Sequence, residues 1–301
     1  MTELSVDPHA AFTADVALSA LTAACQEVGL SADDADLIRV GSNAVFRLAH
    51  DVIARVAPSD AALHNAELQI HVAQWLAALD YPAVRAIPVD QPVQAAGRVV
   101  TFWQSIAPET AYAPIDQVAE LIKRLHELAP PADFVLPPLR PFGAPDDPLP
   151  TFAGLDDVDR AFLRQRLAWA RRTFPTLDFP LGVGPIHGDA NVGNVLLDPD
   201  GRAVLVDLDS FAVGPREWDL IQTALFADRL GWHSETEYRK FVKVYGYDIR
   251  SWDGYETLAD MREIAMTAWL SRKADANAAT EAHKRITAMR TGASRRDWGA
   301  Y

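Results

Sequence analysis

A short predicted hairpin constrains the fold more than any other part of this 301-residue chain. Two strand-like runs, 194–197 and 202–207, enclose the segment 198–201, whose sequence Asp-Pro-Asp-Gly combines residues that favour tight turns. If the turn is centred within this segment, Asn194 and Asp207 lie at the same end of the hairpin. We therefore predict two short strands that bring an amide and a carboxylate together.

The residues before the hairpin complete a pattern that carries chemistry. Segment 187–194 begins with His187-Gly188-Asp189, ends at Asn194, and fits H-x-D-x-x-x-x-N. In this catalytic-loop pattern the Asp accepts the proton of an attacking hydroxyl, the Asn holds Mg²⁺, and a later Asp, here Asp207, also holds the metal. Mg²⁺ prefers such oxygen ligands together with substrate phosphates. An isolated Asp before a turn is usually a cap. Here Asn194 lies at the expected distance after Asp189, a hairpin follows, and Asp207 ends that hairpin, so the catalytic interpretation is favoured. We expect His187 to be a structural hydrogen-bonding residue.

The region from about 186 to 220 resembles the aminoglycoside phosphotransferase and choline kinase-like family, whose loop has the sequence H-G-D-x-x-x-x-N. Eukaryotic-type protein kinases have Arg where this chain has Gly188. The resemblance implies a two-lobed α+β protein-kinase-like fold, with a small N-lobe built on an antiparallel sheet and a larger, mainly helical C-lobe. It also implies that Asp219 is a buried brace of the loop. For Asp209 two alternatives stay open: it lies near the metal or substrate, or it is a solvated turn residue.

The resemblance divides the chain into an N-lobe over 1–104, which binds nucleotide, and a C-lobe over 105–301, which carries the catalytic and acceptor-binding parts. We predict a helix between Thr13 and Gly29, followed by two strand-like runs over 38–48 and 52–56. A proline-dense connection over about 130–150 should lack a helix. Helices are then expected over 118–128, 217–230, 234–245, 255–270 and 280–289.

Two segments of the predicted N-lobe are candidates for nucleotide contacts. The first is a short version of a glycine-rich phosphate loop, which lacks the full G-x-G-x-x-G pattern and consists of Gly41, Ser42 and Asn43. The second is a strand that runs into the expected interlobe hinge, where the resemblance implies backbone hydrogen bonds to adenine or guanine from the neighbourhood of Phe102, Trp103 and Gln104. The two aromatic side chains are equally compatible with an ordinary core.

Arg55 stands where the kinase pattern V-A-I-K has its phosphate-binding Lys. Arg and Lys differ in geometry, so the substitution affects how phosphate would be held. Glu67 shares a predicted helix face with Leu63 and Ile70, and a carboxylate on an apolar face needs a partner. The resemblance makes Arg55 and Glu67 the counterpart of the family's Lys/Glu ion pair. The alternatives are that Arg55 is a solvated residue of a strand and that Glu67 lies at the edge of its helix with the carboxylate in water.

Charge and composition limit the classes of partner. The formal net charge is −13, which argues against nucleic acid and is compatible with a cationic acceptor. No run approaches the ~20 apolar residues of a membrane span, and Met1–Asp7 lacks the pattern of a signal peptide. The single cysteine, Cys25, has the spacing of a helix core residue. We therefore expect a cytoplasmic protein with neither a membrane nor a nucleic-acid partner.

Together these observations predict a small-molecule kinase. It would transfer the γ-phosphoryl group of ATP or GTP, with Mg²⁺, to a hydroxyl of an aminoglycoside, an amino sugar or a related metabolite. The alternative is a pseudokinase-like module that binds nucleotide without transfer. Carboxylates interleaved with aromatics near the C-terminus would suit ammonium groups or sugar faces, although a solvated acidic face explains them equally well. They are Glu235, Glu237, Asp248, Asp253, Glu256, Asp260 and Glu263.

Overall fold

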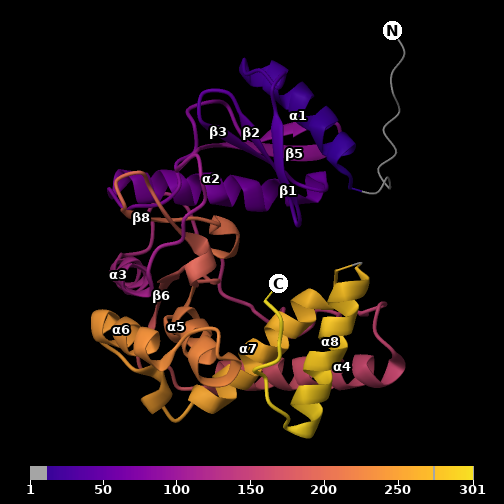
Figure 1. Ribbon diagram of the computed structural model, residues 1–301, viewed down its shortest axis with the longest axis vertical. Coiled ribbons are helices and arrows are strands. Elements are labelled where there is room, and N and C mark those ends of the chain that lie inside the picture. The colour runs from indigo at the N-terminus through magenta and orange to yellow at the C-terminus, as the bar shows by residue number, and fades with distance from the viewer. Residues whose placement is uncertain (1–11, 274, 301) are drawn as a thin grey trace. The chain divides into compact units, whose positions relative to one another are not determined.

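The computed structural model describes residues 12–273 and 275–300, which form two compact units. Met1–Asp7, the segment tested for a signal-peptide pattern, lies outside the described residues. Of the described residues, the first unit contains 12–113, 131–135 and 192–211, and the second contains 114–130, 136–191, 212–273 and 275–300. Figure 1 shows the elements of each unit.

The first unit is built on a five-stranded antiparallel sheet in the order β1-β2-β3-β5-β4. Its strands span Asp36–Val40, Ala44–Leu48, Val52–Val56, Val93–Ala95 and Arg98–Gln104, numbered β1 to β5 in chain order. The run over 38–48 is thus two strands rather than one, because the chain turns at residues 41–43. The predicted antiparallel sheet of a small lobe is present.

Helix α1 (Ala14–Val28) covers one face of this sheet (Figure 1). As predicted, Thr13 caps its first turn and Gly29 follows its last residue in a left-handed conformation. The buried residues recur at helical spacing and pack against strand residues such as Phe46 and Phe102. They are Ala17, Ala20, Leu21, Ala24 and Cys25. The expected core position of Cys25 is therefore confirmed.

The remaining elements of the first unit are helix α2 (Leu63–Ala78) and the hairpin of β7 (Val195–Leu197) and β8 (Ala203–Leu205). The backbone N–H of Ala113 donates to Val195 and the N–H of Val84 donates to Leu205, so the hairpin packs with the N-terminal half of the chain. For this reason the two compact units differ from the predicted division at residue 104.

The second unit is mainly helical, as predicted for the larger lobe. Its two-stranded sheet pairs β6 (Val183–Ile186) with β9 (Ala212–Pro215) in antiparallel register. Its α-helices, numbered α3 to α8, span Ile115–His126, Asp157–Thr173, Glu217–Leu225, Glu235–Tyr245, Tyr255–Leu270 and Ala276–Thr291. A turn of π-helix over Phe226–Leu230 extends α5. The predicted helices are present, whereas α4 (Asp157–Thr173) has no predicted counterpart.

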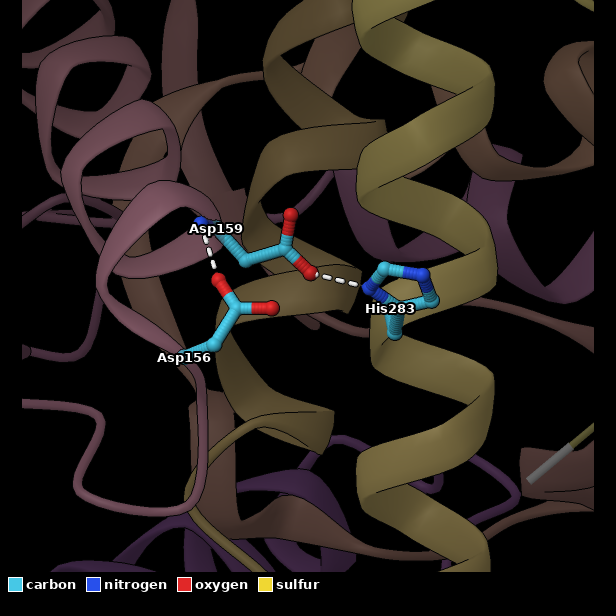
Figure 2. A group of neighbouring side chains, drawn as sticks. All are labelled: Asp156, Asp159 and His283. Carbon is cyan, nitrogen blue, oxygen red and sulfur yellow. Dashed lines mark hydrogen bonds and ion pairs between the residues drawn. The ribbon is translucent and has the colours of Figure 1, made fainter.

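Helix α4 is tied to α8 by a small polar cluster (Figure 2). Asp156 caps α4 by accepting a 2.8 Å hydrogen bond from the N–H of Asp159. The buried Asp159 carboxylate lies 2.5 Å from Nδ1 of His283 and 3.6 Å from Nη1 of Arg290. Capping and ion pairing thus account for all three side chains of the cluster.

Within residues 12–273 and 275–300, no helix is both long and apolar enough to span a membrane.

We predict that Gly214→Ala destabilises the second unit by about 1–3 kcal/mol, because overpacking a filled site forces its neighbours to move. A methyl group on Gly214 would lie 2.7 Å from Cβ of Leu139 and 2.8 Å from Cδ1 of Ile186. Urea denaturation measures the effect. Gly154→Ala is the control, because nothing lies within 4 Å of a methyl group there. Equal stability of the two variants would contradict the prediction.

Candidate active site

A buried carboxylate organises the loop that contains Asp189. The side chain of Asp219, in the first turn of α5, is fully buried in the second unit. It accepts hydrogen bonds of 2.8 Å from the backbone N–H of His187 and of 2.8 Å from the N–H of Gly188. Two consecutive N–H groups that have no strand partner are thereby satisfied, which fixes the path of the chain directly before Asp189.

The same loop depends on a glycine and on a hydrogen-bonding histidine. Gly188 has φ of 83°, a conformation that other L-residues rarely adopt, and its carbonyl accepts a 2.9 Å hydrogen bond from Nε1 of the buried Trp218. His187 is completely buried, and its Nδ1 accepts a 3.3 Å hydrogen bond from the N–H of Asp189. The predicted structural role of His187 is therefore confirmed.

Asp219 has a second set of partners in α3 and α6. Nε2 of the buried His126 lies 3.1 Å from Asp219 and donates to it, while Nδ1 lies 2.8 Å from the hydroxyl of Tyr245. Burial by itself raises the pKa of Asp219, but the hydrogen bond and charge of His126, together with His187, bring it below its ordinary value. The carboxylate is therefore ionised where it braces the loop.

Asp189 has one neighbour that the sequence analysis does not identify. Nη2 of Arg262, from the middle of α7, lies 2.5 Å from Oδ1 of Asp189. The Asp189 side chain is 42% exposed and the Arg262 side chain only 9%, so a largely buried cation holds a carboxylate that reaches solvent. An Arg between Met261 and Glu263, in a helix otherwise rich in apolar residues, is the only sequence signal for this contact.

The other half of the motif belongs to the first unit. Residues 192–194 form a turn of 3₁₀-helix before β7, and the carbonyl of Asn194 accepts a 2.9 Å hydrogen bond from the N–H of Val206. The chain then enters Asp207, which has a left-handed backbone with φ of 59° and begins the turn over Leu208–Ser210. Asn194 and Asp207 therefore flank the same end of the hairpin, as predicted.

Arg55 joins the sheet to this turn. Its Nη2 lies 3.3 Å from a carboxylate oxygen of Asp207 and 3.0 Å from one of Asp209, so the solvated-Arg alternative is wrong. Burial raises the pKa of Asp209 to about 6; Arg55 opposes this rise, and the negative charge of Asp207 adds to it. One guanidinium thus faces two carboxylates, and the surplus negative charge and the oxygen donors fit a hard divalent cation.

The predicted ion pair between Arg55 and Glu67 is wrong. Nη1 of Arg55 donates instead to Oε1 of Gln69, at 3.2 Å, and Nε2 of Gln69 donates to Asn65 at 2.7 Å. Asn65 in turn donates to the backbone carbonyl of Asp209 at 3.2 Å. Glu67 is half exposed and lies 3.9 Å from His64. Two positions along a helix rotate a side chain by more than half a turn, so Gln69 and Glu67 occupy different faces.

Nucleotide contacts near Phe102, Trp103 and Gln104 stay a prediction, but several backbone donors there have partners within the protein. The N–H groups of Phe102, Gln104 and Ser105 donate to Gln91 Oε1 and to the carbonyls of Arg85 and Asp51. These donors are therefore already used within the first unit. The side chains of Phe102 and Trp103 are buried, and Trp103 Nε1 donates to Thr101 at 2.8 Å, which agrees with the core alternative. Gln104, the last residue of β5, is exposed.

The candidate phosphate loop forms the turn between β1 and β2. Gly41 and Ser42 are exposed, and the N–H of Gly41 donates to the carbonyl of Asn43 at 2.9 Å. This geometry describes a tight turn at the open edge of the sheet. Phosphate binding by Gly41, Ser42 and Asn43 stays a prediction.

The chain is similar to known proteins in sequence and in structure. The model of the phosphotransferase enzyme family (APH) matches residues 37–259. A search of curated protein sequences found no match. Solved structures with similar folds include the amicoumacin kinase hAmiN in complex with AMP-PNP, Ca²⁺ and Ami. It has a TM-score of 0.66 and 11% identity, and the alignment covers 89% of this chain and 91% of that one.

Two further structures support the same fold. The aminoglycoside phosphotransferase APH(3'')-Id from Streptomyces rimosus has a TM-score of 0.59 and 20% identity, with 81% of this chain and 97% of that chain covered. A choline/ethanolamine kinase family protein from Mesorhizobium loti has a TM-score of 0.58 and 17% identity, with coverage of 92% and 94%. The predicted two-lobed protein-kinase-like fold is thereby confirmed.

We predict that Asp219→Asn lowers the free energy of unfolding at pH 7 by about 1–3 kcal/mol, because an amide meets the two loop N–H groups less well than a carboxylate. The pKa of Asp219 is lower in the folded protein than in the unfolded chain. Its ionised form therefore stabilises the fold above a pH of about 4, and this stabilisation is lost as the pH falls below that value towards the folded-state pKa.

Urea denaturation between pH 3 and pH 7 measures both effects. The loss of stability on acidification should be smaller in Asp219→Asn than in the unmodified protein. An identical acid dependence in the two proteins would show that Asp219 is not ionised where it braces the loop.

Proposed function

Because the chain belongs to the phosphotransferase enzyme family, we propose that it transfers the γ-phosphoryl group of ATP or GTP to a hydroxyl of a small molecule. The family match covers most of the described chain and identifies a phosphotransferase. The donor and the acceptor are the parts that we propose. We expect the acceptor to be an aminoglycoside, an amino sugar or a related metabolite.

The observation that carries this proposal is the bracing of the loop that precedes Asp189. The buried Asp219 holds the N–H groups of His187 and Gly188, and the N–H of Asp189 donates to His187. A catalytic base must be held in place before the acceptor arrives, because a misplaced base loses much of its effect. This preorganisation supports Asp189 as the group that accepts the proton of the attacking hydroxyl.

The first unit supplies the residues that would hold metal and nucleotide. We assign Mg²⁺ to Asn194 and Asp207, whose oxygen donors suit it, and nucleotide contacts to Gly41, Ser42, Asn43 and Arg55. When bound, Mg²⁺ neutralises charge on the transferred phosphoryl group. Arg55 already faces an acidic pair, and its planar guanidinium can hold two phosphate oxygens. Gln69 supports Arg55 in place of the predicted Glu67.

A second candidate function is nucleotide binding without transfer. Arg55 in place of Lys, with Asp207 and Asp209 as its partners, is the observation that favours this alternative. Binding without turnover is its signature. The experiment on Asp189 separates it from the enzyme.

We predict Mg²⁺-dependent transfer of labelled γ-phosphate from ATP or GTP to a member of a pooled panel of aminoglycosides, amino sugars, choline and nucleoside antibiotics. Asp189→Asn should lower kcat by at least about 100-fold, the usual effect of losing a positioned base. Its affinity for ADP should stay unchanged. Full turnover in Asp189→Asn would exclude Asp189 as the base, and ADP binding with no labelled product in any pool would favour the alternative without transfer.

We also predict that Gln69→Ala raises KM for the nucleotide about 3- to 10-fold, the cost of one hydrogen bond of typical strength. The change removes the support of Arg55 by α2 and leaves KM for the acceptor unaltered. Steady-state kinetics with each substrate varied in turn measure both constants. Glu67→Ala is the matched control on the same helix, and it should behave as the unmodified protein. A larger effect for Glu67→Ala than for Gln69→Ala would restore the original pairing.

A further inference from the structure

Arg262 is held against Asp189 from several sides within the second unit. Its Nη2 lies 2.5 Å from Asp189 and also donates to Oε1 of Gln222, on α5. Its guanidinium carbon lies 5.1 Å from the centre of the Trp218 ring, which adds a cation–π contact. The residue is only 8% exposed. The guanidinium is therefore a fixed part of the surroundings of Asp189 rather than a mobile surface charge.

This guanidinium has more donors than the chain uses. Arg carries five N–H donors on three nitrogens. In the part of the chain that the structure describes, Arg262 donates hydrogen bonds from Nη2 only, and its Nε is buried without a partner. Buried donors without an acceptor are rare and call for an explanation. Because Nε is buried, an oxygen atom of a bound molecule would instead reach Nη1, which makes no hydrogen bond within the described residues.

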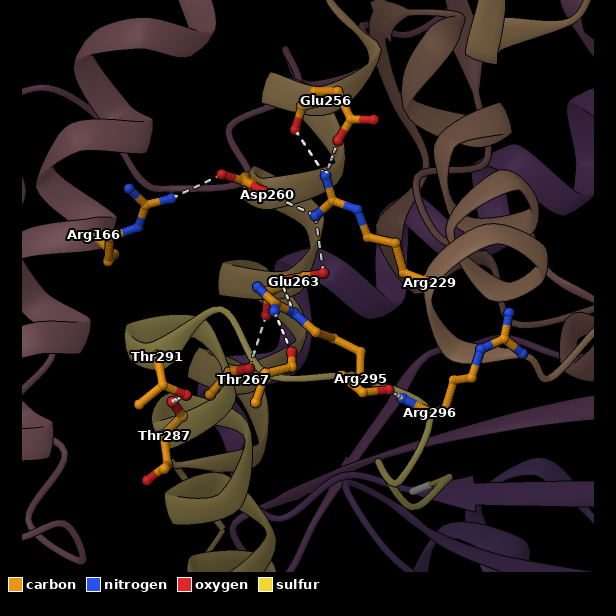
Figure 3. A network of polar contacts seen from close by, with 12 residues as sticks. Arg166, Arg229, Glu256, Asp260, Glu263, Thr267, Thr287, Thr291, Arg295 and Arg296 are labelled. Carbon is orange, nitrogen blue, oxygen red and sulfur yellow. Dashed lines mark hydrogen bonds and ion pairs between the residues drawn. The ribbon is translucent and has the colours of Figure 1, made fainter.

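The acidic residues near the C-terminus do not offset this positive charge, because arginines on neighbouring elements occupy most of them. Figure 3 shows the network in which Arg229 contacts three carboxylates of α7. Arg166 and Arg295 complete the network. The residues paired in this way are Glu256, Asp260 and Glu263. Arg250 pairs in the same manner with Glu235 and Asp248.

We propose that Arg262 binds the acceptor molecule next to the hydroxyl that receives the phosphoryl group. The N–H groups of its Nη1 bind an acceptor oxygen next to the hydroxyl that Asp189 deprotonates. The chain therefore selects hydroxyls flanked by a hydroxyl, carbonyl or carboxylate, and disfavours those flanked by an ammonium group. An amino sugar or aminoglycoside remains a suitable acceptor where its ammonium groups lie further from the reacting hydroxyl. The inference rests on the proposed function, because it assigns the reacting hydroxyl to Asp189.

The reaction balances without a proton from Arg262. Asp189 takes the hydroxyl proton, the hydroxyl oxygen bonds to the γ-phosphorus, and the bond between that phosphorus and the bridging oxygen breaks to release the nucleoside diphosphate. Arg262 stays protonated throughout, because its guanidinium does not lose its proton in proteins. It acts by orienting Asp189 and by donating to the acceptor. An ammonium in the same place would meet a like charge, and the guanidinium offers it no hydrogen-bond acceptor.

The test uses three acceptors of similar size. Glycolate, ethylene glycol and ethanolamine place a carboxylate, a hydroxyl and an ammonium group, respectively, beside the only type of hydroxyl that each molecule can offer for transfer. We expect kcat/KM of the unmodified protein to be at least about tenfold higher for glycolate or ethylene glycol than for ethanolamine, the effect of one charge-assisted hydrogen bond. Arg262→Gln should abolish this preference through KM of the acceptor and leave KM of the nucleotide unchanged. Arg262→Lys should retain part of it.

The control is Arg239→Gln, which removes an exposed arginine that pairs with Glu235 on α6. It should leave the preference intact. Thermal unfolding and ADP binding establish that each variant is folded, and Arg262→Lys carries the test if Arg262→Gln fails to fold. For any acceptor from the pooled panel, phosphorus–proton correlation in the NMR spectrum of the product identifies the neighbours of the phosphorylated hydroxyl.

The outcomes separate the inference from the proposed function. Absence of transfer to every acceptor overturns both. Transfer with an unchanged preference in the Arg262 variants overturns the inference alone. A product whose phosphate lies next to an ammonium-bearing carbon, without an oxygen substituent on its other side, also overturns the inference and leaves the proposed function standing.

Discussion

The second unit depends on the buried carboxylate of Asp219. Its two oxygens receive the N–H groups of His187 and Gly188, and they also receive Nε2 of His126. An ionised group is expensive to bury, and only several charge-assisted hydrogen bonds offset that expense. Here those hydrogen bonds come from α3 and from the loop that precedes Asp189. Burial of α5 against these elements therefore also fixes the path of the loop, so the fold and the candidate site share one interaction.

In the first unit, Arg55 has a comparable organising role. It is a strand residue that reaches a turn more than 150 positions later in the chain, where it faces Asp207 and Asp209. A Lys at this position would present one compact charge, whereas the planar guanidinium divides its N–H groups among three side chains. One of these is the neutral amide of Gln69. Arg55 and Gln69 thus stand in place of the expected Lys and Glu. A neutral Gln69 suffices as a partner, since Asp207 and Asp209 already compensate the charge of Arg55.

Much of the fold could be predicted because local signals agree with the final structure. Thr13 and Gly29 bound α1, and the turn sequence of segment 198–201 separates β7 from β8. Helix α4 was missed because it contains many charged residues, and its stabilising contacts come from α7 and α8, which are distant in sequence. The split of β1 and β2 was missed because the strand residues flanking the turn at 41–43 are apolar on both sides.

The candidate site shows the same division between local and long-range information. The spacing of Asp189, Asn194 and Asp207 along the chain can be recognised without a structure, because the pattern is short. The partner of Arg55 depends on which face of α2 meets the sheet, and an error of two positions exchanges Gln69 for Glu67. Arg262 could not be found from sequence, because a buried arginine and an exposed one look alike until the helix is placed against α5.

Net charge is a poor guide to the acceptor for a related reason. The whole chain carries −13, and this value by itself favours a cationic partner. In the second unit, however, arginines pair with most of the acidic residues of α6 and α7, and the charge held against Asp189 is positive. Recognition depends on the groups that an acceptor would touch, while the sum over the surface affects encounter and solubility. The local arrangement therefore decides which hydroxyl can approach Asp189.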